Sequence, residues 1–151
     1  METVRHLLQS KSPEIWSVAP DATVFEALQL MAEKDVGALL VMDGDRLVGI
    51  FSERDYARKV ILRDRSSRQT LVREIMTSQV ICVSPEQTID ECMALMTARH
   101  IRHLPVVDSN QRVCGVISIG DVVKAVISDQ ALLISHLHSY ILGDRGEYLG
   151  S

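Results

Sequence analysis

The chain has 151 residues, of which 46% are hydrophobic, and a net charge of -4 with acidic and basic residues mixed along its length. This composition supports a packed core and offers no basic stripe of the kind that neutralises a nucleic-acid backbone. Apolar runs such as GALLVM are far shorter than the roughly 20 residues of a membrane span, and the N-terminus lacks a signal-peptide pattern. We therefore expect a cytoplasmic protein with no nucleic-acid and no membrane partner.

The first half of the chain predicts a helix followed by a strand hairpin. Thr23 is suited to capping a helix, and apolar residues recur after it at helical spacing, at Val24, Ala27, Leu28 and Met31. The short apolar runs ALLVM and LVGIFS flank the turn-forming DGDR, which predicts two strands joined by a hairpin. The next stretch, ERDYARKVILRD, returns to helical spacing.

The second half predicts the same elements in the same order. A polar stretch, RDRSSRQT, suits an exposed linker, and LVREIMT predicts a short helix. A helix from Thr88 to Arg99 precedes predicted strands at HLPVV and VCGVIS, and another helix begins at about Ile119. The segment DQALLISHLHSYIL predicts a closing helix, followed by a polar, loose tail, GDRGEYLGS.

The two halves form an internal repeat. Four pairs of matching residues are 65 positions apart: Pro20 and Pro85, Thr23 and Thr88, Met31 and Met96, Asp43 and Asp108. One extra residue in the second turn moves the next three pairs to a spacing of 66: Gly49 and Gly115, Ser52 and Ser118, Asp55 and Asp121. The chain therefore repeats one multi-part pattern, which predicts two copies of one structural unit.

These repeats resemble a pair of cystathionine-β-synthase (CBS) domains, known together as a Bateman module. The most specific stretches are LVREIMT, RHIRHLPVVD and GVISIGD. The resemblance implies an α+β fold of two β-α-β-β-α units that pack their sheets together about a pseudo-twofold axis. We expect repeat 1 at residues 7–65, repeat 2 at 71–127, a C-terminal helix at 128–142 that packs or dimerises, and a polar tail at 143–151.

The same resemblance implies a function. CBS pairs are regulatory sensors that bind adenosine ligands, such as AMP, ADP, ATP, NAD(H) or S-adenosylmethionine, in the clefts between repeats, and many form dimers. We therefore expect a homodimer that binds AMP, ADP/ATP or NAD(H), senses energy or redox state, and acts on a separate regulated protein. Mg2+ is expected only as an ion that accompanies a nucleotide.

The motif Gly-x-x-Ser-x-x-Asp supplies the predicted contacts to the ligand. Asp55 and Asp121 lie in the first turn of a predicted helix, where a carboxylate can accept hydrogen bonds from a ribose diol. Ser52 and Ser118 mark the same helix starts, which favour a phosphate. Ser-x-x-Asp is also typical of a capping box, in which both side chains bind backbone N–H groups of their own helix. The motif alone leaves both interpretations open.

Basic residues provide the other predicted phosphate contacts. Arg102 and His103 belong to a cationic cluster in RHIRH, where CBS pairs that bind nucleotides place basic residues, although cations also favour a helix C-terminus. Arg54 and Lys11 are further candidates, with a free surface lysine as the alternative for Lys11. Repeat 1 has Gly37 and Ala38 where repeat 2 has Arg102 and His103. The clefts should therefore differ, with more phosphate favoured at Asp55 and AMP at Asp121.

The base is expected to lie against the short strand that precedes each repeated proline. Ile15 and Trp16 in repeat 1, and Val80 and Ile81 in repeat 2, are the predicted walls. Trp16 can stack on adenine, but an aromatic residue at this position is also typical of a core.

Other functional classes have weaker support. The sequence shows no nucleophile pattern, paired carboxylates or Walker loop, so we expect no enzyme activity. The histidine pairs in RHIRH and SHLHS lack the spacing and partners of a protein-built metal site, and the three cysteines are expected to be reduced core residues. The alternative function is a ligand-independent dimerisation or interaction module that regulates a partner protein.

Overall fold

The computed structural model describes residues 2–11 and 14–149, with side-chain environments given as far as Leu142. Repeat 1 contains β1 (Ser17–Val18), α2 (Val24–Lys34), β2 (Ala38–Asp43), β3 (Arg46–Ser52), α3 (Glu53–Tyr56) and the π-helix η1 (Ala57–Ile61). Strand β1 pairs in parallel with β2, and β2 pairs antiparallel with β3. Repeat 2 contains α5 (Ile89–Arg99), β4 (His103–Val107), β5 (Val113–Ser118) and the start of α6 (Ile119–Leu149), with β4 and β5 antiparallel. The short helices α1 (Val4–Gln9) and α4 (Val72–Ile75) precede the two repeats.

Local sequence signals explain where the main helices begin and end. Thr23 and Thr88 cap α2 and α5, and each side chain accepts a hydrogen bond of 3.1 Å from the third residue of its helix. Asp35 and His100 end the same helices in the left-handed conformation, each with φ near 54°. The predicted α+β fold of two repeats is confirmed, including the strands at HLPVV and VCGVIS.

Two local expectations are wrong, and a third is borne out with a different type of helix. The strands predicted at Ile15–Trp16 and Val80–Ile81 lie further along the chain, because the chain first pairs with β2 at Ser17 and with β4 only through Val83. The helix expected after β3 is present, as α3 followed by a π-helix from Ala57. Cys82 and Cys114 are exposed, and only Cys92 is a core residue.

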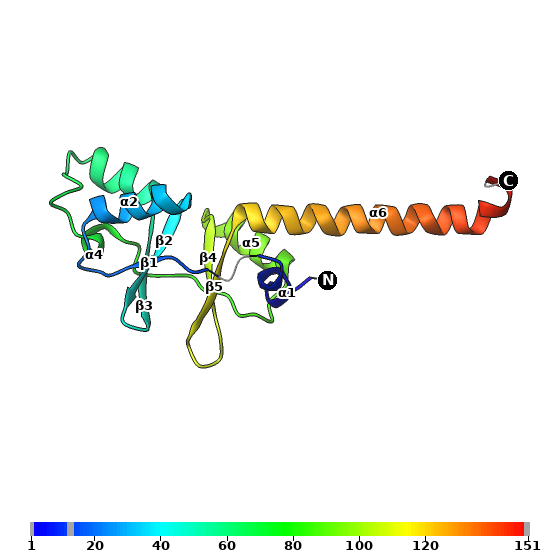
Figure 1. Cartoon of the computed structure of the whole chain (residues 1–151), viewed down its shortest axis with the longest axis horizontal. Coiled ribbons are helices and arrows are strands. Elements are labelled where there is room, and N and C mark those ends of the chain that lie inside the picture. Colours follow the sequence, from blue (N-terminus) through cyan, green and yellow to red (C-terminus); the bar gives the residue numbers. More distant parts are fainter. Residues whose placement is uncertain (1, 12–13, 150–151) are drawn as a thin grey trace.

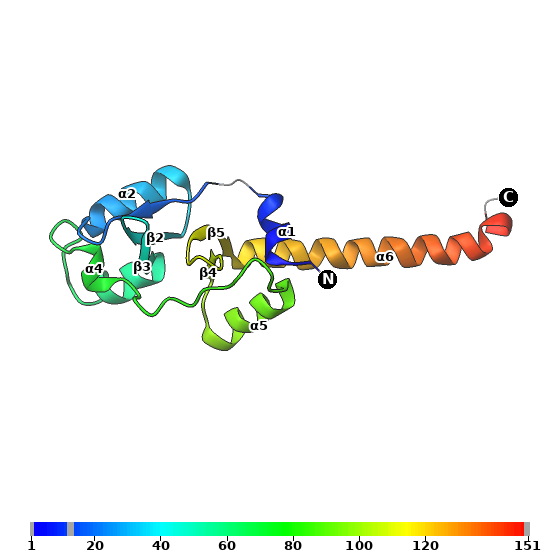
Figure 2. The same cartoon turned by 90° about the horizontal axis from the view of Figure 1, so that it is seen from below.

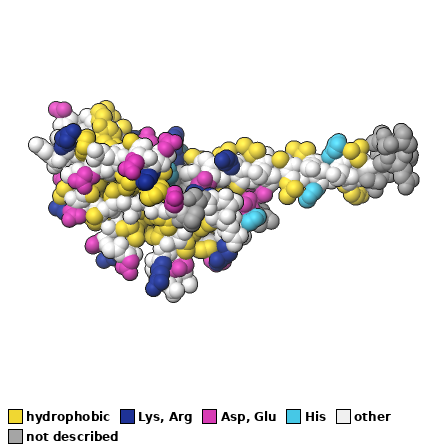
Figure 3. Space-filling model, viewed as in Figure 1, with side chains coloured by type: hydrophobic (Ala, Val, Ile, Leu, Met, Phe, Trp, Pro, Cys, Tyr) yellow, Lys and Arg dark blue, Asp and Glu magenta, His cyan; other side chains and the backbone are white. Residues whose placement is uncertain are grey.

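The C-terminal segment also differs from the prediction. The helix that begins at Ile119 and the expected closing helix form one continuous helix, α6, whose 31 residues include positions assigned to a loose tail. Residues 150 and 151 lie outside the described part of the chain. At 1.5 Å per residue this helix is about 46 Å long. It projects from the body formed by the two repeats (Figures 1 and 2), and the space-filling view shows hydrophobic side chains along the projection (Figure 3).

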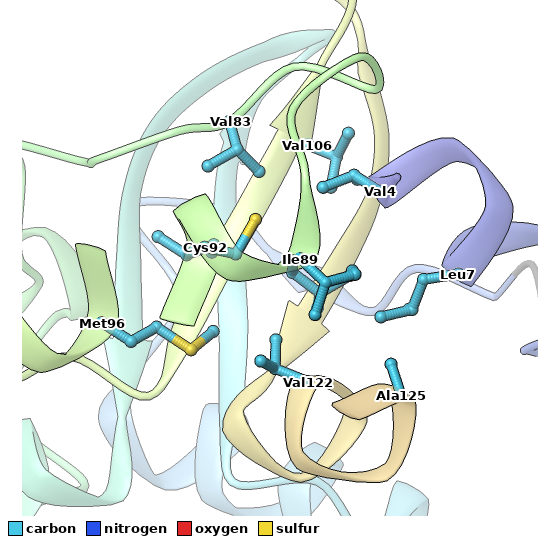
Figure 4. Packing of buried hydrophobic residues seen from close by; sticks show 11 residues of the cluster. Val4, Leu7, Val83, Ile89, Cys92, Met96, Val106, Val122 and Ala125 are labelled. Carbon is cyan, nitrogen blue, oxygen red and sulfur yellow. The ribbon is translucent and has the colours of Figure 1, made fainter. Parts of the chain in front are cut away.

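Each repeat is completed by the helix that precedes the other repeat. Helix α1 precedes repeat 1 in the chain but lies beside α5 and the base of α6 in repeat 2 (Figure 2). Its residues Val4 and Leu7 pack with Ile89 and Val122 in the core of repeat 2 (Figure 4). In the same way, Val72 and Ile75 of α4 belong to the core of repeat 1. The two repeats therefore exchange helices, and neither core is complete without the other half of the chain.

The repeated glycine allows this exchange. An added Cβ at Gly49 would lie 2.5 Å from the sulfur of Met76 and 3.1 Å from the carbonyl oxygen of Thr77. At Gly115 it would lie 2.8 Å from Cδ2 of Leu8. Both glycines leave room for the segment that arrives from the other half, which explains why the pattern keeps a glycine at this position.

Candidate functional site

A cavity lies between the two repeats and joins both Ser-x-x-Asp motifs. Its volume is about 1020 Å3, at the upper end of the roughly 300–1,000 Å3 typical of small-molecule sites. Ten of the twelve predicted site residues line it: Lys11, Ile15, Trp16, Ser52, Arg54, Asp55, Arg102, His103, Ser118 and Asp121. Val80 and Ile81 are absent from its lining, and Ile81 packs against the core of repeat 2 instead. The base walls predicted at Val80 and Ile81 are therefore not part of this cavity.

In repeat 1 the motif forms a fully bonded capping box. Ser52 caps α3, and its backbone N–H donates to Oδ2 of Asp55 over 3.0 Å, while the N–H of Asp55 donates to Oγ of Ser52 over 3.2 Å. The other oxygen, Oδ1, accepts a hydrogen bond of 3.2 Å from the Thr77 hydroxyl and lies 3.1 Å from Nζ of Lys59. The Asp55 side chain is only 10% exposed. Both of its oxygens are already bound by groups of the protein.

In repeat 2 the same motif is less enclosed. The backbone N–H of Ser118 donates to Oδ2 of Asp121 over 2.8 Å, and Nζ of Lys11 lies 2.6 Å from that same oxygen. Within the described part of the chain, Oδ1 of Asp121 accepts no hydrogen bond. The side chain is 25% exposed at the cavity. One carboxylate oxygen of Asp121 is therefore available to a ligand.

The surroundings of Asp121 also set its charge. Burial by itself would raise the pKa of this carboxyl, but hydrogen bonds from Lys11 and from the Ser118 N–H, together with the Lys11 charge, leave the pKa below its usual value. Asp121 is therefore ionised at neutral pH. Lys11 also donates to the carbonyl oxygen of Val116 over 2.7 Å, so the segment after α1 is fixed to the end of β5.

Aligned positions explain why the two motifs differ. Lys59 lies one helical turn after Asp55, and the position with the same offset from Asp121 is Ala125. Thr77 pairs with Ile50 of β3 through two backbone hydrogen bonds of 2.9 Å, which bring its hydroxyl to Asp55. In repeat 2 the matching carbonyl, on Val116, is bound by the Lys11 side chain. Lys59 and Thr77 were not among the predicted site residues, although the offset of Lys59 from Asp55 is visible in the sequence.

The cationic side chains of the cavity do not act as one group. Arg54 donates to the carbonyl oxygen of His100 over 2.6 Å and so caps the C-terminus of α5 from the other repeat. Arg102 is exposed and, among the described residues, forms no ion pair.

Arg58 also lines the cavity and was missed in the sequence. The missed acidic lining residues are Glu14, Asp35 and Glu53. With Asp55 and Asp121, acids balance the cations, so the cavity carries no strong positive charge.

His103 is a neutral side chain at pH 7. Burial lowers its pKa most, Asp121 raises it, and Arg102 and Lys11 lower it, with a net result below the usual value. A charged His103 that donates to phosphate is therefore not the state of the unliganded cavity.

Trp16 contributes to both the cavity and the core. It lines the cavity, packs against the core of repeat 1, and has Nζ of Lys34 at 4.4 Å from the centre of its ring. The core alternative therefore describes part of its surface, and stacking on adenine stays a prediction.

No group of three or more His, Cys, Asp and Glu side chains in the described ranges is placed to hold a metal ion. None of the helices described here is long and apolar enough to cross a bilayer.

Comparison with known proteins gives consistent matches. The CBS domain model matches twice, at residues 4–62 and 72–128. The mitochondrial CBS domain-containing protein CBSX3 of Arabidopsis thaliana is 38% identical in an alignment of 151 positions. The alignment covers 93% of this chain and 72% of that protein. Its name places that relative in the mitochondrion, so a cytoplasmic location stays a prediction for this chain.

Solved structures show the same architecture. A putative signal-transduction protein with CBS domains from Burkholderia ambifaria is 54% identical, with a TM-score of 0.82 over 85% of this chain and 96% of that one. The CBS domain pair of protein MJ0100, in complex with 5'-methylthioadenosine and S-adenosyl-L-methionine, is 23% identical, with a TM-score of 0.75 over 85% of this chain and 98% of that one. At that identity the second match shows the shared fold alone. The chain belongs to the CBS domain family and is a tandem pair of CBS repeats.

Proposed function

We propose that the protein is a regulatory CBS pair that binds an adenine nucleotide between its repeats and acts on a separate protein. The observation that carries this proposal is the cavity that joins both motifs, in which Asp121, unlike Asp55, has a carboxylate oxygen, Oδ1, with no hydrogen bond among the described residues. An ionised carboxylate with a free oxygen can accept hydrogen bonds from a ribose diol. The MJ0100 pair, which holds two adenosine compounds, supports the choice of ligand class.

The other parts of a nucleotide also have partners near Asp121. The start of α6 lies beside Ser118, and a helix N-terminus favours a phosphate, although the N–H groups of Ile119 and Asp121 already donate to the Arg102 carbonyl and the Ser118 hydroxyl. Arg102 lines the same cavity and can form a forked pair with phosphate oxygens. Ile15 and Trp16 provide an apolar wall for a flat base. Together these groups complement a nucleoside with a small phosphate group.

The charge balance of the cavity favours a ligand with little negative charge. Acidic side chains lie beside the cations, and Arg54, expected to bind additional phosphate at Asp55, is bonded to His100. We therefore propose AMP as the preferred ligand over ATP, with NAD(H) as a larger alternative that could occupy both halves of the cavity. The prediction that the Asp55 side favours polyphosphate has weaker physical support than the prediction of AMP at Asp121.

Thermal unfolding of the full chain with added nucleotides tests this function. AMP, NADH, and ATP with and without Mg2+ are compared with inorganic phosphate as the control. A ligand at 100 times its Kd stabilises the native state by about 2.7 kcal/mol, which corresponds to an increase in Tm of about 5–10 °C at this chain length. We expect the largest increase with AMP and none with phosphate. No increase with any nucleotide, at concentrations up to several millimolar, would instead support the ligand-independent interaction module.

A further inference from the structure

The distal part of α6 carries an apolar surface that the body of the protein does not cover. Ala125 is the last buried residue of the helix, and every residue from Ile127 to Leu142 is exposed. Large apolar side chains in this segment have more than a third of their area in contact with solvent: Ile127, Leu132, Leu133, Ile134, Leu137, Tyr140, Ile141 and Leu142. A run of exposed apolar side chains this long marks an interaction surface.

Four of these eight side chains, Ile127, Ile134, Leu137 and Ile141, lie on one face of the helix. Ile127, Ile134 and Ile141 recur every seven residues, and Val123, Gln130 and Leu137 recur every seven residues between them, with alternating gaps of three and four. This is the spacing of the two seam positions of a coiled coil. We call these six residues the α6 seam. Ile at the first position with Leu at the second, the combination of Ile134 and Leu137, favours two strands.

The seam needs a partner for the helix to be stable. Isolated helices of about 12–15 residues are only marginally stable in water, and most helices in proteins gain their stability from a packed apolar face. After Val126 the side chains of α6, as far as Leu142, contact no core. Figures 1 and 2 show that the helix extends away from both repeats. The missing contact must therefore come from outside this chain.

Charge indicates which partner fits. Between Ser128 and Leu142 the sequence has one acid, Asp129, and no Lys or Arg. A helix that lies on a membrane surface typically carries Lys and Arg on its polar face, and this segment carries none. A two-fold interface places each residue near the same surface on the other copy, so a seam almost free of charge is complementary to itself.

We infer that two copies of this chain associate through the α6 seam as a two-stranded helical pair. In such a dimer each copy has its own cavity between the repeats. The paired α6 helices would link the two cavities, because each α6 starts at Ile119, next to Ser118 of the motif. This inference concerns the seam only and does not depend on ligand binding.

Sedimentation velocity of the full-length protein over a range of concentrations tests the inference. We expect a species of twice the chain mass of 16.8 kDa for the wild type. Ile134→Glu places a charge in the centre of the seam and should weaken dimerisation by at least about 100-fold, because the carboxylate would be buried without a partner. Leu137→Glu should have the same effect. Both side chains are exposed in the monomer, so neither change should alter its fold.

Leu132→Glu is the matched control. Leu132 is 56% exposed on the same helix, but its side chain points away from the seam. This variant should dimerise like the wild type, and circular dichroism and thermal unfolding at low concentration should show that all three variants keep the repeats folded. A monomeric wild type at about 100 μM, above the micromolar range of weak specific dimers, would overturn the inference. A dimer equally sensitive to Leu132→Glu and Ile134→Glu, or capture of monomeric wild type by anionic vesicles, would also overturn it.

Discussion

Asp55 and Asp121 occupy the same place in a duplicated motif, yet their chemical situations differ. Both form capping contacts with the serine three residues earlier. Asp55 also binds Thr77 and Lys59 and is almost enclosed, whereas Asp121 has Lys11 on one oxygen and the other oxygen free of hydrogen bonds in the described structure. The duplicated motif therefore has the same capping geometry in both repeats, but the protein itself occupies more of the Asp55 carboxylate than of the Asp121 carboxylate.

This difference bears on the two interpretations of Ser-x-x-Asp. Capping and ligand binding are compatible, because an ionised carboxylate has about four acceptor positions and a capping box uses only part of them. In repeat 1 the remaining positions are filled by the protein, which indicates a structural role for Asp55. In repeat 2 they remain in part available, which favours a role in binding for Asp121.

The largest expected difference between the two motifs is in nucleotide affinity. Asp121→Asn should weaken AMP binding by about 30- to 150-fold, because losing a charged acceptor of hydrogen bonds removes about 2–3 kcal/mol. Asp55→Asn should change the affinity by less than about threefold, since its oxygens already have partners. Isothermal titration calorimetry of both variants measures the ratio. A larger loss of affinity in Asp55→Asn would reverse the assignment of the two sites.

The second difference is in stability. Asp55→Ala leaves the N–H of Ser52, the hydroxyl of Thr77 and the ammonium group of Lys59 without their acceptor in a nearly enclosed site. We expect the free energy of unfolding to fall by about 2–4 kcal/mol, against about 1 kcal/mol for Asp121→Ala, whose neighbours are more solvated. Urea denaturation of the unliganded variants gives both values. Equal losses would show that the enclosure of Asp55 does not contribute to stability.

The smallest expected effect concerns pH and the contact between Lys11 and Asp121. The pKa of Asp121 in the folded protein is below its usual value of 3.8. The ionised carboxylate therefore stabilises the folded state at pH values above 3.8. This stabilisation is lost as the pH falls through the pKa of the folded state. Lys11→Met should raise the pKa of Asp121 and remove most of this contribution. The wild type should therefore exceed the variant in stability near neutral pH, and the excess should shrink below about pH 4.

The matched control for this prediction is Lys124→Met, an exposed lysine on α6. Urea unfolding of all three proteins at several pH values measures the effect. An excess of wild type over Lys11→Met that does not change with pH would contradict an electrostatic role for this contact.

The sequence predicted the parts of the fold that depend on local patterns. The spacing of apolar residues after Thr23 determines which face of α2 is buried, and the strands predicted on either side of DGDR, and at HLPVV and VCGVIS, lie near their predicted positions. It did not reveal the exchange of α1 and α4, because the packing of Val4 on Ile89 links segments that no local pattern relates. The start of β1 was misplaced for a similar reason, since pairing with β2 decides it.

For the site, the sequence alone determined which chemical groups are present and that they occur twice: the serines, the carboxylates and the cationic cluster before β4. Tertiary structure decided which of these groups are already bound. Thr77 is 22 residues from Asp55 and Lys11 is 110 residues from Asp121 along the chain, and only the folded arrangement brings them within hydrogen-bonding distance. A motif specifies donors and acceptors, but their availability depends on neighbours that are distant in sequence, because hydrogen bonds and burial act through space.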